Sequence, residues 1–480
     1  MMRSPDLAED KADLVVIGAG SGGLSVASGA AQLGLKVVLY ERGEMGGDCL
    51  NSGCVPSKAL IAAGKSAHAM RHAARFGIAN AEPQVDWAKV RAHVADVIAT
   101  IAPIDSQERF EGLGCRVIRE HARFADPQTI VSASSRVRAR RIVIAAGGGP
   151  AVPPIPGLAQ TPYYTNLNIF QIPDLPKHLI VLGGGAIGME LAQAFRRLGS
   201  DVTLLEMERC LGRDDAEAAA CVVAALRADG VVIREGAKAV QVSGQAGAVS
   251  VEIEEAGARS RIDGTHLLVA VGRSVHTDGL DLEAGGVAFD KTGVINTPYL
   301  RTNNPRVWVV GDISGREKFT HAAGFHASVF VTNALFKVKM RADSSPMPHA
   351  TYTEPELAQI GLNEAQAKDQ FGDKVMVTRW GFHENDRAQA ERSHEGFAKL
   401  VIGPKAKILG ATIVGEGAGD LIQIVTLAMA NGLSVRAFTK YIAPYPTRGE
   451  IVKRLASAYY SPTLFSPRTR KLISVLQRIP

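Results

Sequence analysis

Two stretches of the chain repeat the same order of hydrophobic and polar positions. Each opens with four consecutive apolar residues, passes through closely spaced glycines, and ends in a second apolar run followed by glutamate; they cover residues 14–41 and 179–206. A short apolar run bounded by turn residues is typical of a buried strand. Each stretch therefore predicts a strand, a tight glycine turn, a helix and a second, parallel strand.

The remaining pattern predicts a mixed α/β protein whose last part is organised differently. Residues 60–125 have a mainly helical pattern, and the glycine- and proline-rich residues 146–157 indicate a crossover linker. Alternating strands and helices after about residue 346 indicate a separate α+β domain. The expected strands are 129–134, 136–145, 267–272, 307–312, 350–353, 374–382, 398–402 and 408–414, and the expected helices are 319–330, 363–371 and 416–431.

Composition agrees with a multidomain globular protein. The chain has 480 residues, 46% of them hydrophobic, which predicts about three domains. The net charge of +6 forms no dense basic stripe before the C-terminus, so nucleic-acid binding is not predicted. The charged start, Met1 to Asp13, is unlike a signal peptide, and no apolar run approaches the span of a bilayer. We therefore expect a cytoplasmic protein.

The glycines of the two repeats have the spacing of dinucleotide-binding loops. One glycine permits the turn, one lets the backbone approach a pyrophosphate, and one lets the helix pack on the strand. In both repeats a glutamate follows the first glycine by 23 positions, where it can accept hydrogen bonds from a ribose. The predicted binding residues are Gly18, Gly20, Gly23 and Glu41 in the first repeat, and Gly183, Gly185, Gly188 and Glu206 in the second.

Glu206 also bears on the choice of cofactor. A carboxylate at this strand end repels a 2′-phosphate, so the sequence favours NAD(H) over NADP(H). Arg209 lies three residues later, and for this reason NADP(H) stays open as an alternative.

Two of the five cysteines, Cys49 and Cys54, lie five positions apart just after the first repeat. Two thiols that can bridge hold two electrons as a disulfide and pass them on by thiolate attack. The alternatives are a structural disulfide or half of a metal site, but no second Cys/His cluster completes four ligands, so no metal site is predicted. We expect the remaining thiols, Cys115, Cys210 and Cys221, to be inert and partly buried.

With these motifs the chain resembles the flavin-dependent pyridine nucleotide–disulfide oxidoreductases, which include dihydrolipoamide dehydrogenase, glutathione reductase and mercuric reductase. The resemblance extends from about Asp13 to Leu455. Its markers are residues 18–23, 46–49, 54–58 and 183–188, the pairs Gly272-Arg273 and Gly311-Asp312, and residues 352–356.

The resemblance implies two nested Rossmann-like domains for FAD and NAD(P), followed by an α+β dimerisation domain that builds a homodimer. The implied boundaries are 1–155 with 275–345 for FAD, 156–274 for NAD(P), 346–460 for dimerisation and 461–480 for a basic tail. Cys54 would lie against the flavin, and Cys49 would meet the substrate. Lys58, near the flavin, would pair with Glu190. Gly147 and Asp312 would bind FAD, and Gly272 would bind NAD.

The sequence departs from the family near the C-terminus. Disulfide-reducing members have a His-Pro-Thr-x-x-Glu segment whose histidine serves the partner subunit as an acid–base group. Here Tyr445 takes the histidine's place, while the frame from Pro446 to Glu450 is kept. Mercuric reductases resemble this chain at that position. They also have a cysteine pair near the C-terminus, and this chain has no cysteine after Cys221.

We therefore predict an oxidoreductase that passes electrons from NAD(P)H through FAD and Cys49–Cys54 to an external thiol, disulfide or soft-metal acceptor, with an active site like that of mercuric reductase. One alternative is a dihydrolipoamide dehydrogenase that oxidises a lipoyl partner with NAD. An alternative of another class is a redox sensor or membrane-docked electron carrier.

The tail is the only feature that favours a membrane-docked protein. It is basic after Glu450, and Leu472, Val475, Leu476 and Ile479 share one helical face. Such a segment can lie on an anionic membrane or pack against the dimer. Pro462 and Pro467 are expected to separate it from the preceding helix.

Overall fold

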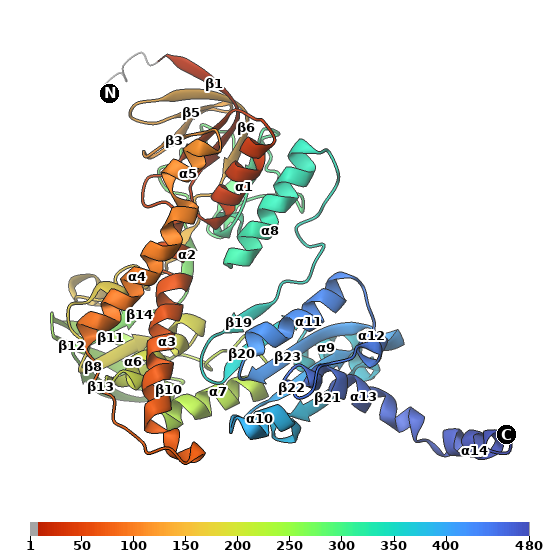
Figure 1. Ribbon diagram of the computed structural model, residues 1–480. Helices are drawn as coiled ribbons and strands as arrows, with labels where there is room; N and C mark the ends of the chain where they lie inside the picture. Colours follow the sequence, from red (N-terminus) through yellow and green to blue (C-terminus); the bar gives the residue numbers. More distant parts are fainter. Residues whose placement is uncertain (1–7, 480) are drawn as a thin grey trace.

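The computed structural model describes residues 8–479, so the first seven residues of the charged N-terminal segment lie outside it. The three largest of the six sheets in the described residues organise the chain (Figure 1). The predicted fold class, two nested dinucleotide-binding units followed by an α+β domain, is confirmed.

The first sheet has the strand order β3-β2-β1-β6-β5-β4, and β18 pairs with the last residues of β6, beyond β5 and on the edge away from β1. In the sequence, β18 comes after the second dinucleotide-binding unit, yet it completes the sheet of the first unit. The second unit is therefore inserted into the first. The strands are β1 Glu9–Ile17, β2 Val37–Tyr40, β3 Cys115–Ile118, β4 Arg123–Asp126, β5 Thr129–Val131, β6 Arg136–Ile144 and β18 Val307–Val309. Helices α1 (Ser21–Gln32) and α8 (Thr320–Phe330) lie side by side on one face (Figure 1).

The second sheet is wholly parallel, with the order β10-β9-β8-β14. Its elements are β8 His178–Leu182, α6 Ala186–Arg197, β9 Asp201–Glu206, α7 Ala216–Ala228, β10 Val232–Glu235 and β14 His266–Val269. An antiparallel meander of β11 (Lys238–Gln245), β12 (Ala248–Glu255) and β13 (Ala258–Gly264) packs on it.

The apolar runs of the two repeats are central strands that are buried on both faces. In β1, Leu14 and Val16 belong to one hydrophobic core, while Val15 and Ile17 belong to the core on the other face. The residues of β8 divide between two cores in the same way. Burial on both faces explains why the runs are continuously apolar rather than alternating.

A helical layer joins the two units. It consists of α2 (Gly47–Asn51), α3 (Cys54–Arg71), α4 (Trp87–Asp105) and α5 (Gln107–Gly112). The long helix α3 packs against α6 of the second unit, so it extends from the first unit along the second (Figure 1). The thiol-bearing segment is therefore held by both units.

The C-terminal domain has an antiparallel sheet in the order β19-β20-β23-β22-β21. Its strands are β19 His349–Thr351, β20 Glu356–Gly361, β21 Met376–Gly381, β22 Phe397–Ile402 and β23 Ile408–Gly415. Its helices are α9 Glu364–Phe371, α10 Asp386–Ala390, α11 Ala418–Ala430, α12 Arg436–Lys440, α13 Glu450–Leu464 and α14 Pro467–Leu476. None of the helices in the described part of the chain is both long and apolar enough to cross a bilayer.

Several local predictions were incomplete, and the one for Pro462 was wrong. The mainly helical segment 60–125 ends in β3 and β4, short strands that depend on pairing with β2 and β5. The linker 146–157 contains β7 (Gly148–Pro150), which pairs with β15 (Arg273–Val275). The strand β20 follows the expected strand 350–353 and was not predicted. Pro462 does not end α13 but lies in its last turns.

Candidate active site

A single large cavity runs between the first two units and includes both glycine loops. Its volume is about 2510 Å³, and its lining includes Cys49, Cys54 and Arg273. Pockets for one small ligand typically measure about 300–1,000 Å³. This cavity is therefore large enough for two dinucleotides whose reactive ends meet beside the thiols.

The two glycine loops have nearly the same geometry. A Cβ atom added at Gly23 would lie 1.8 Å from the Gly18 oxygen, and one added at Gly188 would lie 1.9 Å from the Gly183 oxygen. Gly18 and Gly183 have φ angles of +106° and +108°, which side chains disfavour. The first glycine of each loop is thus required by its backbone angle, and the third is required by close packing against the first.

The middle glycines are free of such contacts. At Gly185 no protein atom lies within 4 Å of an added Cβ, and at Gly20 the nearest is 3.9 Å away. Both glycines line the cavity and precede the first residues of α6 and α1. The backbone N–H groups of a helix start bind phosphate well. Both loops therefore fit the pyrophosphate of a dinucleotide.

The predicted glutamates lie at the ends of β2 and β9 beside these loops. Glu41 accepts hydrogen bonds from Ala19 N (2.6 Å) and Gly43 N (2.6 Å). Glu206 accepts them from Gly184 N (2.7 Å) and Glu208 N (3.0 Å). The backbone thus fixes both carboxylates where the ribose of a dinucleotide would lie.

The hydrogen bonds of Arg209 bear on whether this site can bind the 2′-phosphate of NADP(H). Its Nη2 donates to the carbonyl oxygens of Gly212 (3.0 Å) and Asp214 (3.1 Å). The Nη2 end of the guanidinium is therefore held by the backbone of its own loop, while Nη1 is buried without a hydrogen-bond partner in the described part of the chain. Glu206, fixed by backbone N–H groups, lies at the nucleotide position.

The two thiols lie on two successive helices, the short α2 and the long α3, rather than on one helix. Cys49 belongs to α2, and Cys54 is the first residue of α3. The turn between them needs Gly53, where an added Cβ would lie 2.9 Å from the Asp48 oxygen. Both cysteines are free thiols.

The environments of the two sulfurs shift their pKa values in opposite directions. The hydrogen bond from Cys49 lowers the pKa of Cys54 to about 6, and Thr320 and Lys58 act in the same direction. The same hydrogen bond and burial raise the pKa of Cys49. The Thr320 hydroxyl lies 3.4 Å from the Cys54 sulfur. Cys54 is thus the thiolate of the pair at neutral pH.

Lys58 and Glu190 connect the thiol helix to the second unit. The Lys58 Nζ donates to Glu190 Oε2 at 2.6 Å, as the resemblance implied. The other carboxylate oxygen of Glu190 accepts from Tyr352 N at 2.8 Å, and Lys58 Nζ lies 4.4 Å from the centre of the Tyr352 ring. A residue of the C-terminal domain therefore completes this contact, and the sequence alone did not point to it.

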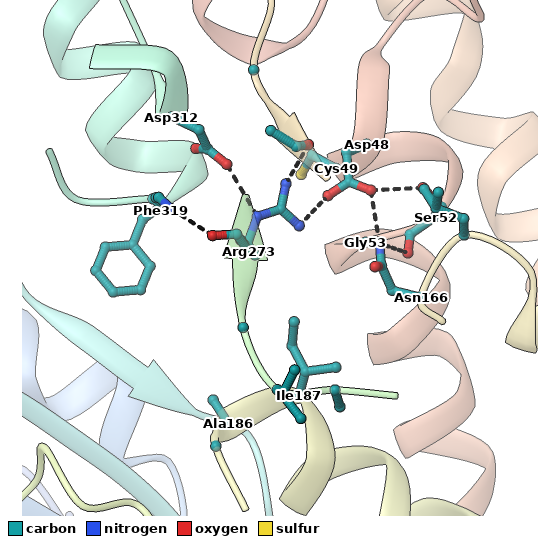
Figure 2. Close-up of a pocket in the computed structure, with 18 of the residues that line it drawn as sticks. Asp48, Cys49, Ser52, Gly53, Asn166, Ala186, Ile187, Arg273, Asp312 and Phe319 are labelled. Atoms are coloured by element: carbon teal, nitrogen blue, oxygen red, sulfur yellow. Dashed lines mark hydrogen bonds and ion pairs between the residues drawn. The ribbon is translucent and has the colours of Figure 1, made fainter. Parts of the chain in front are cut away.

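Arg273 is a further residue that sequence reasoning did not place in the site. It donates to Asp48 (2.7 Å), Asp312 (3.0 Å) and the Gly148 oxygen (3.0 Å), so it ties together three segments of the cavity wall (Figure 2). Asp48 also accepts from Ser52 and Asn166. The Gly272-Arg273 pair was the available signal, because a charged residue directly after a buried strand and glycine marks a site edge.

The other predicted cofactor residues also line the cavity. Gly147 (φ +69°) and Gly272 (φ +131°) have no protein atom within 4 Å of an added Cβ. Asp312 lies at the same cavity wall, with its carboxylate on Arg273.

Tyr445 and Glu450 are not brought to the thiols of their own chain. The Tyr445 side chain is 71% exposed, and its hydroxyl donates to Asp386 Oδ2 at 2.8 Å. This hydrogen bond raises the pKa of Tyr445 above its ordinary value. Glu450 pairs with Arg454 on α13 at 2.7 Å instead of with the tyrosine. Asp386 was not predicted, because 59 residues separate it from Tyr445.

The remaining cysteines have the properties of unreactive thiols. Burial raises the pKa of Cys115 to about 11 and that of Cys210 to about 12, and it also raises the pKa of Cys221. Within residues 8–479, no group of three or more His, Cys, Asp or Glu side chains is placed to hold a metal ion.

Two dinucleotide loops and a pair of cysteines that line one cavity are typical of a flavin- and nicotinamide-dependent disulfide oxidoreductase. The chain matches the family described as pyridine nucleotide-disulphide oxidoreductase over residues 12–327 and its dimerisation domain over residues 347–456. It therefore belongs to the pyridine nucleotide-disulphide oxidoreductase family, whose members bind FAD and NAD(P)H, and its dimerisation domain indicates a homodimer.

Similar proteins carry more than one name. The chain is 34% identical to a mercuric reductase of Streptomyces lividans, with 94% of this chain and 96% of the relative covered. It is 35% identical to a dihydrolipoyl dehydrogenase of Thermus scotoductus, with 93% and 97% covered. Among solved structures, a Cu(II) complex of the HOCl-induced flavoprotein disulfide reductase RclA from Escherichia coli matches with a TM-score of 0.83 at 26% identity, covering 92% of this chain and 99% of that one.

Proposed function

We propose that this protein uses NADH to reduce a soft metal ion that is bound between the sulfurs of Cys49 and Cys54. The observation that carries the proposal is Tyr445, whose hydroxyl is bonded to Asp386 and whose pKa is raised. The oxidation of a dithiol needs a base that makes the attacking thiolate. A tyrosine with a raised pKa is a poor base at neutral pH, whereas a soft ion binds thiolates without such a base.

The residues around the cavity support electron transfer from NADH through FAD to the two sulfurs. Bound FAD would supply the relay between a two-electron hydride donor and the dithiol. Gly18, Gly20, Gly23, Glu41 and Asp312 would hold FAD, and Gly183, Gly185, Gly188 and Glu206 would hold NADH. Lys58, fixed by Glu190, stabilises the negative charge of the Cys54 thiolate.

The electrons and protons of the overall reaction balance without a protein side chain that stores a proton. NADH loses two electrons and a proton and becomes NAD⁺, and a divalent ion such as Hg(II) gains both electrons and becomes the neutral metal. The proton is released to water. The Cys54 thiolate and the Cys49 thiol bind the ion before reduction, and the Cys49 proton goes to water. When the metal leaves, Cys54 returns to the thiolate form and Cys49 takes up a proton again.

The first experiment mixes the anaerobic, FAD-loaded protein with dihydrolipoamide and follows flavin absorbance by stopped flow. We expect slow reduction in protein that NADH reduces rapidly, and steady NADH oxidation when Hg(II) is supplied as a low-molecular-weight thiolate complex. Cu(II) is assayed in parallel, since a related structure holds that ion. Rapid reduction by dihydrolipoamide would contradict the proposal and place the dihydrolipoamide dehydrogenase alternative first.

Tyr445→His separates the two functions further. A histidine has a pKa near neutrality, so it should raise flavin reduction by dihydrolipoamide by roughly 100-fold. The metal-dependent rate should stay about the same. Tyr445→Phe, which removes only the hydroxyl, is the matched control and should give no gain with dihydrolipoamide.

A further inference from the structure

The last residues of the chain hold the whole net charge of the protein. Residues 451–480 contain six basic residues and no acidic one, while the full chain contains 54 basic and 48 acidic residues. The preceding 450 residues therefore contain 48 of each sign and are formally neutral. The basic residues of the terminal segment are Lys453, Arg454, Arg468, Arg470, Lys471 and Arg478.

The end of this segment, residues 464–479, extends away from the C-terminal domain and is here called the C-terminal arm (Figure 1). It contains the last residue of α13 and the whole of α14, and no residue of α14 is buried. Its large apolar side chains are between 45% and 67% exposed; they are Leu464, Phe465, Leu472, Ile473, Val475, Leu476 and Ile479. The arm therefore presents an apolar surface that the rest of its own chain does not cover.

Helical geometry separates most of the apolar side chains of the arm from three of its basic ones. At about 100° per residue, Leu472, Val475, Leu476 and Ile479 fall within one face of the helix. Arg470, Lys471 and Arg478 fall on its flank and on the opposite side, whereas Arg468 lies on the apolar face at the start of the helix. An exposed helix with this division is typical of segments that lie in the plane of a membrane interface.

We propose that the C-terminal arm binds the surface of a bilayer that contains anionic lipids. The apolar face would enter the boundary between headgroups and acyl chains, and the basic flank would pair with the headgroup phosphates. Charge complementarity favours this surface over a second copy of the chain. The body of another copy is formally neutral, and its arm is basic and repels this one. The matched dimerisation domain also ends at residue 456, before the arm begins.

A single arm of this kind binds weakly, because one short amphipathic segment gives only marginal affinity. Each basic residue near an anionic surface contributes roughly a fivefold factor to binding. A homodimer presents two arms, and the second then binds at high effective concentration. Binding should therefore need both the dimer and anionic lipid, and it should weaken as salt screens the charges.

The test is co-sedimentation of the full-length, FAD-loaded protein with vesicles. One set of vesicles contains phosphatidylcholine alone, and the other also contains phosphatidylglycerol. We expect the protein to sediment with the second set only. The triple variant Arg468→Gln/Arg470→Gln/Lys471→Gln should lose affinity on the order of 100-fold. Leu472→Ser/Leu476→Ser should also lose most of the binding.

A matched control removes three exposed lysines of the same domain, Lys374→Gln/Lys405→Gln/Lys407→Gln, and should bind like the original protein. A chain that ends after Leu464 should not bind, but should keep its dimeric state and its rate of flavin reduction by NADH. Equal recovery of the full and shortened chains in the supernatant with anionic vesicles would overturn the proposal. Loss of the dimer on shortening would also overturn it, since the arm would then belong to a partner subunit.

Discussion

The two dinucleotide-binding units share one sequence template, yet only the first supplies reactive sulfur. In each unit a cysteine follows the second strand of the template. Cys54 of the first unit lies at a helix start, is open to the cavity and has its pKa lowered to about 6. Cys210 of the second unit is buried against Gly184, and its pKa is raised to about 12.

The difference arises from the chain that follows the second strand of each unit. After β2 the backbone passes through Gly46 and Gly47, both with positive φ, and lies over the first glycine loop before α2 begins. After β9 the chain folds down onto its own loop, where the Leu211 N–H bonds to the Gly184 oxygen. The shared template therefore provides dinucleotide binding, and the segment that follows its second strand decides whether a thiol becomes reactive.

The largest effects should come from the third glycine of each loop. Gly23→Ala should abolish FAD retention, because its Cβ would collide with the Gly18 oxygen. Gly188→Ala makes the equivalent collision and should leave FAD bound while abolishing flavin reduction by NADH. Flavin absorbance of the purified protein and anaerobic NADH titration measure the two losses. Gly112→Ala, which meets no atom within 4 Å, is the control and should change neither.

The next effect concerns the ion pair that joins the units. Glu190→Gln keeps the shape of the side chain but removes the charge that fixes Lys58. We expect about a tenfold slower reduction of bound flavin by NADH, because small displacements of a positioning group are costly. Stopped-flow absorbance measures the rate, and the FAD content should stay constant. A loss of FAD with no change in rate would show that the pair acts on cofactor binding instead.

The contrast between the thiols should be visible as a pH dependence. Because the pKa of Cys54 is lowered, its thiolate is present above about pH 6 and is lost as the pH falls through that value. Iodoacetamide should therefore label Cys54 of the reduced, flavin-free protein with a half-maximal rate near pH 6, as measured by peptide mass spectrometry. Cys210 should stay unlabelled over the same range, since its pKa is raised. Equal labelling of both would remove the distinction between the units.

The smallest effect should be on the choice of nucleotide. Glu206→Gln removes the negative charge that repels a 2′-phosphate, so the preference for NADH over NADPH should fall by about tenfold. Arg209 should limit the gain, because its Nη2 already donates to the carbonyls of Gly212 and Asp214 and only Nη1 is without a partner among the described residues. The ratio of kcat/KM for the two nucleotides measures the change. Glu41→Gln in the first unit is the matched control and should leave this ratio unaltered.

The sequence by itself determined the features that depend on neighbouring residues. The glycine loops, the apolar central strands and the Cys49–Cys54 pair are local patterns, because steric limits at a turn and burial on both faces of a strand act over a few positions. These patterns were sufficient for the fold class and for the family.

Only the tertiary structure decided the features that depend on distant residues. Arg273 meets Asp48 across 225 positions, Tyr352 meets Glu190 across 162, and Asp386 binds Tyr445 across 59. Short strands such as β3 and β20 form because a neighbouring strand offers them hydrogen bonds, and their own residues do not require it. The opposite pKa shifts of Cys49 and Cys54 likewise follow first from the hydrogen bond between the two sulfurs, which raises one pKa and lowers the other. At Cys54, Thr320 and Lys58, which the fold alone brings to this sulfur, lower the pKa further.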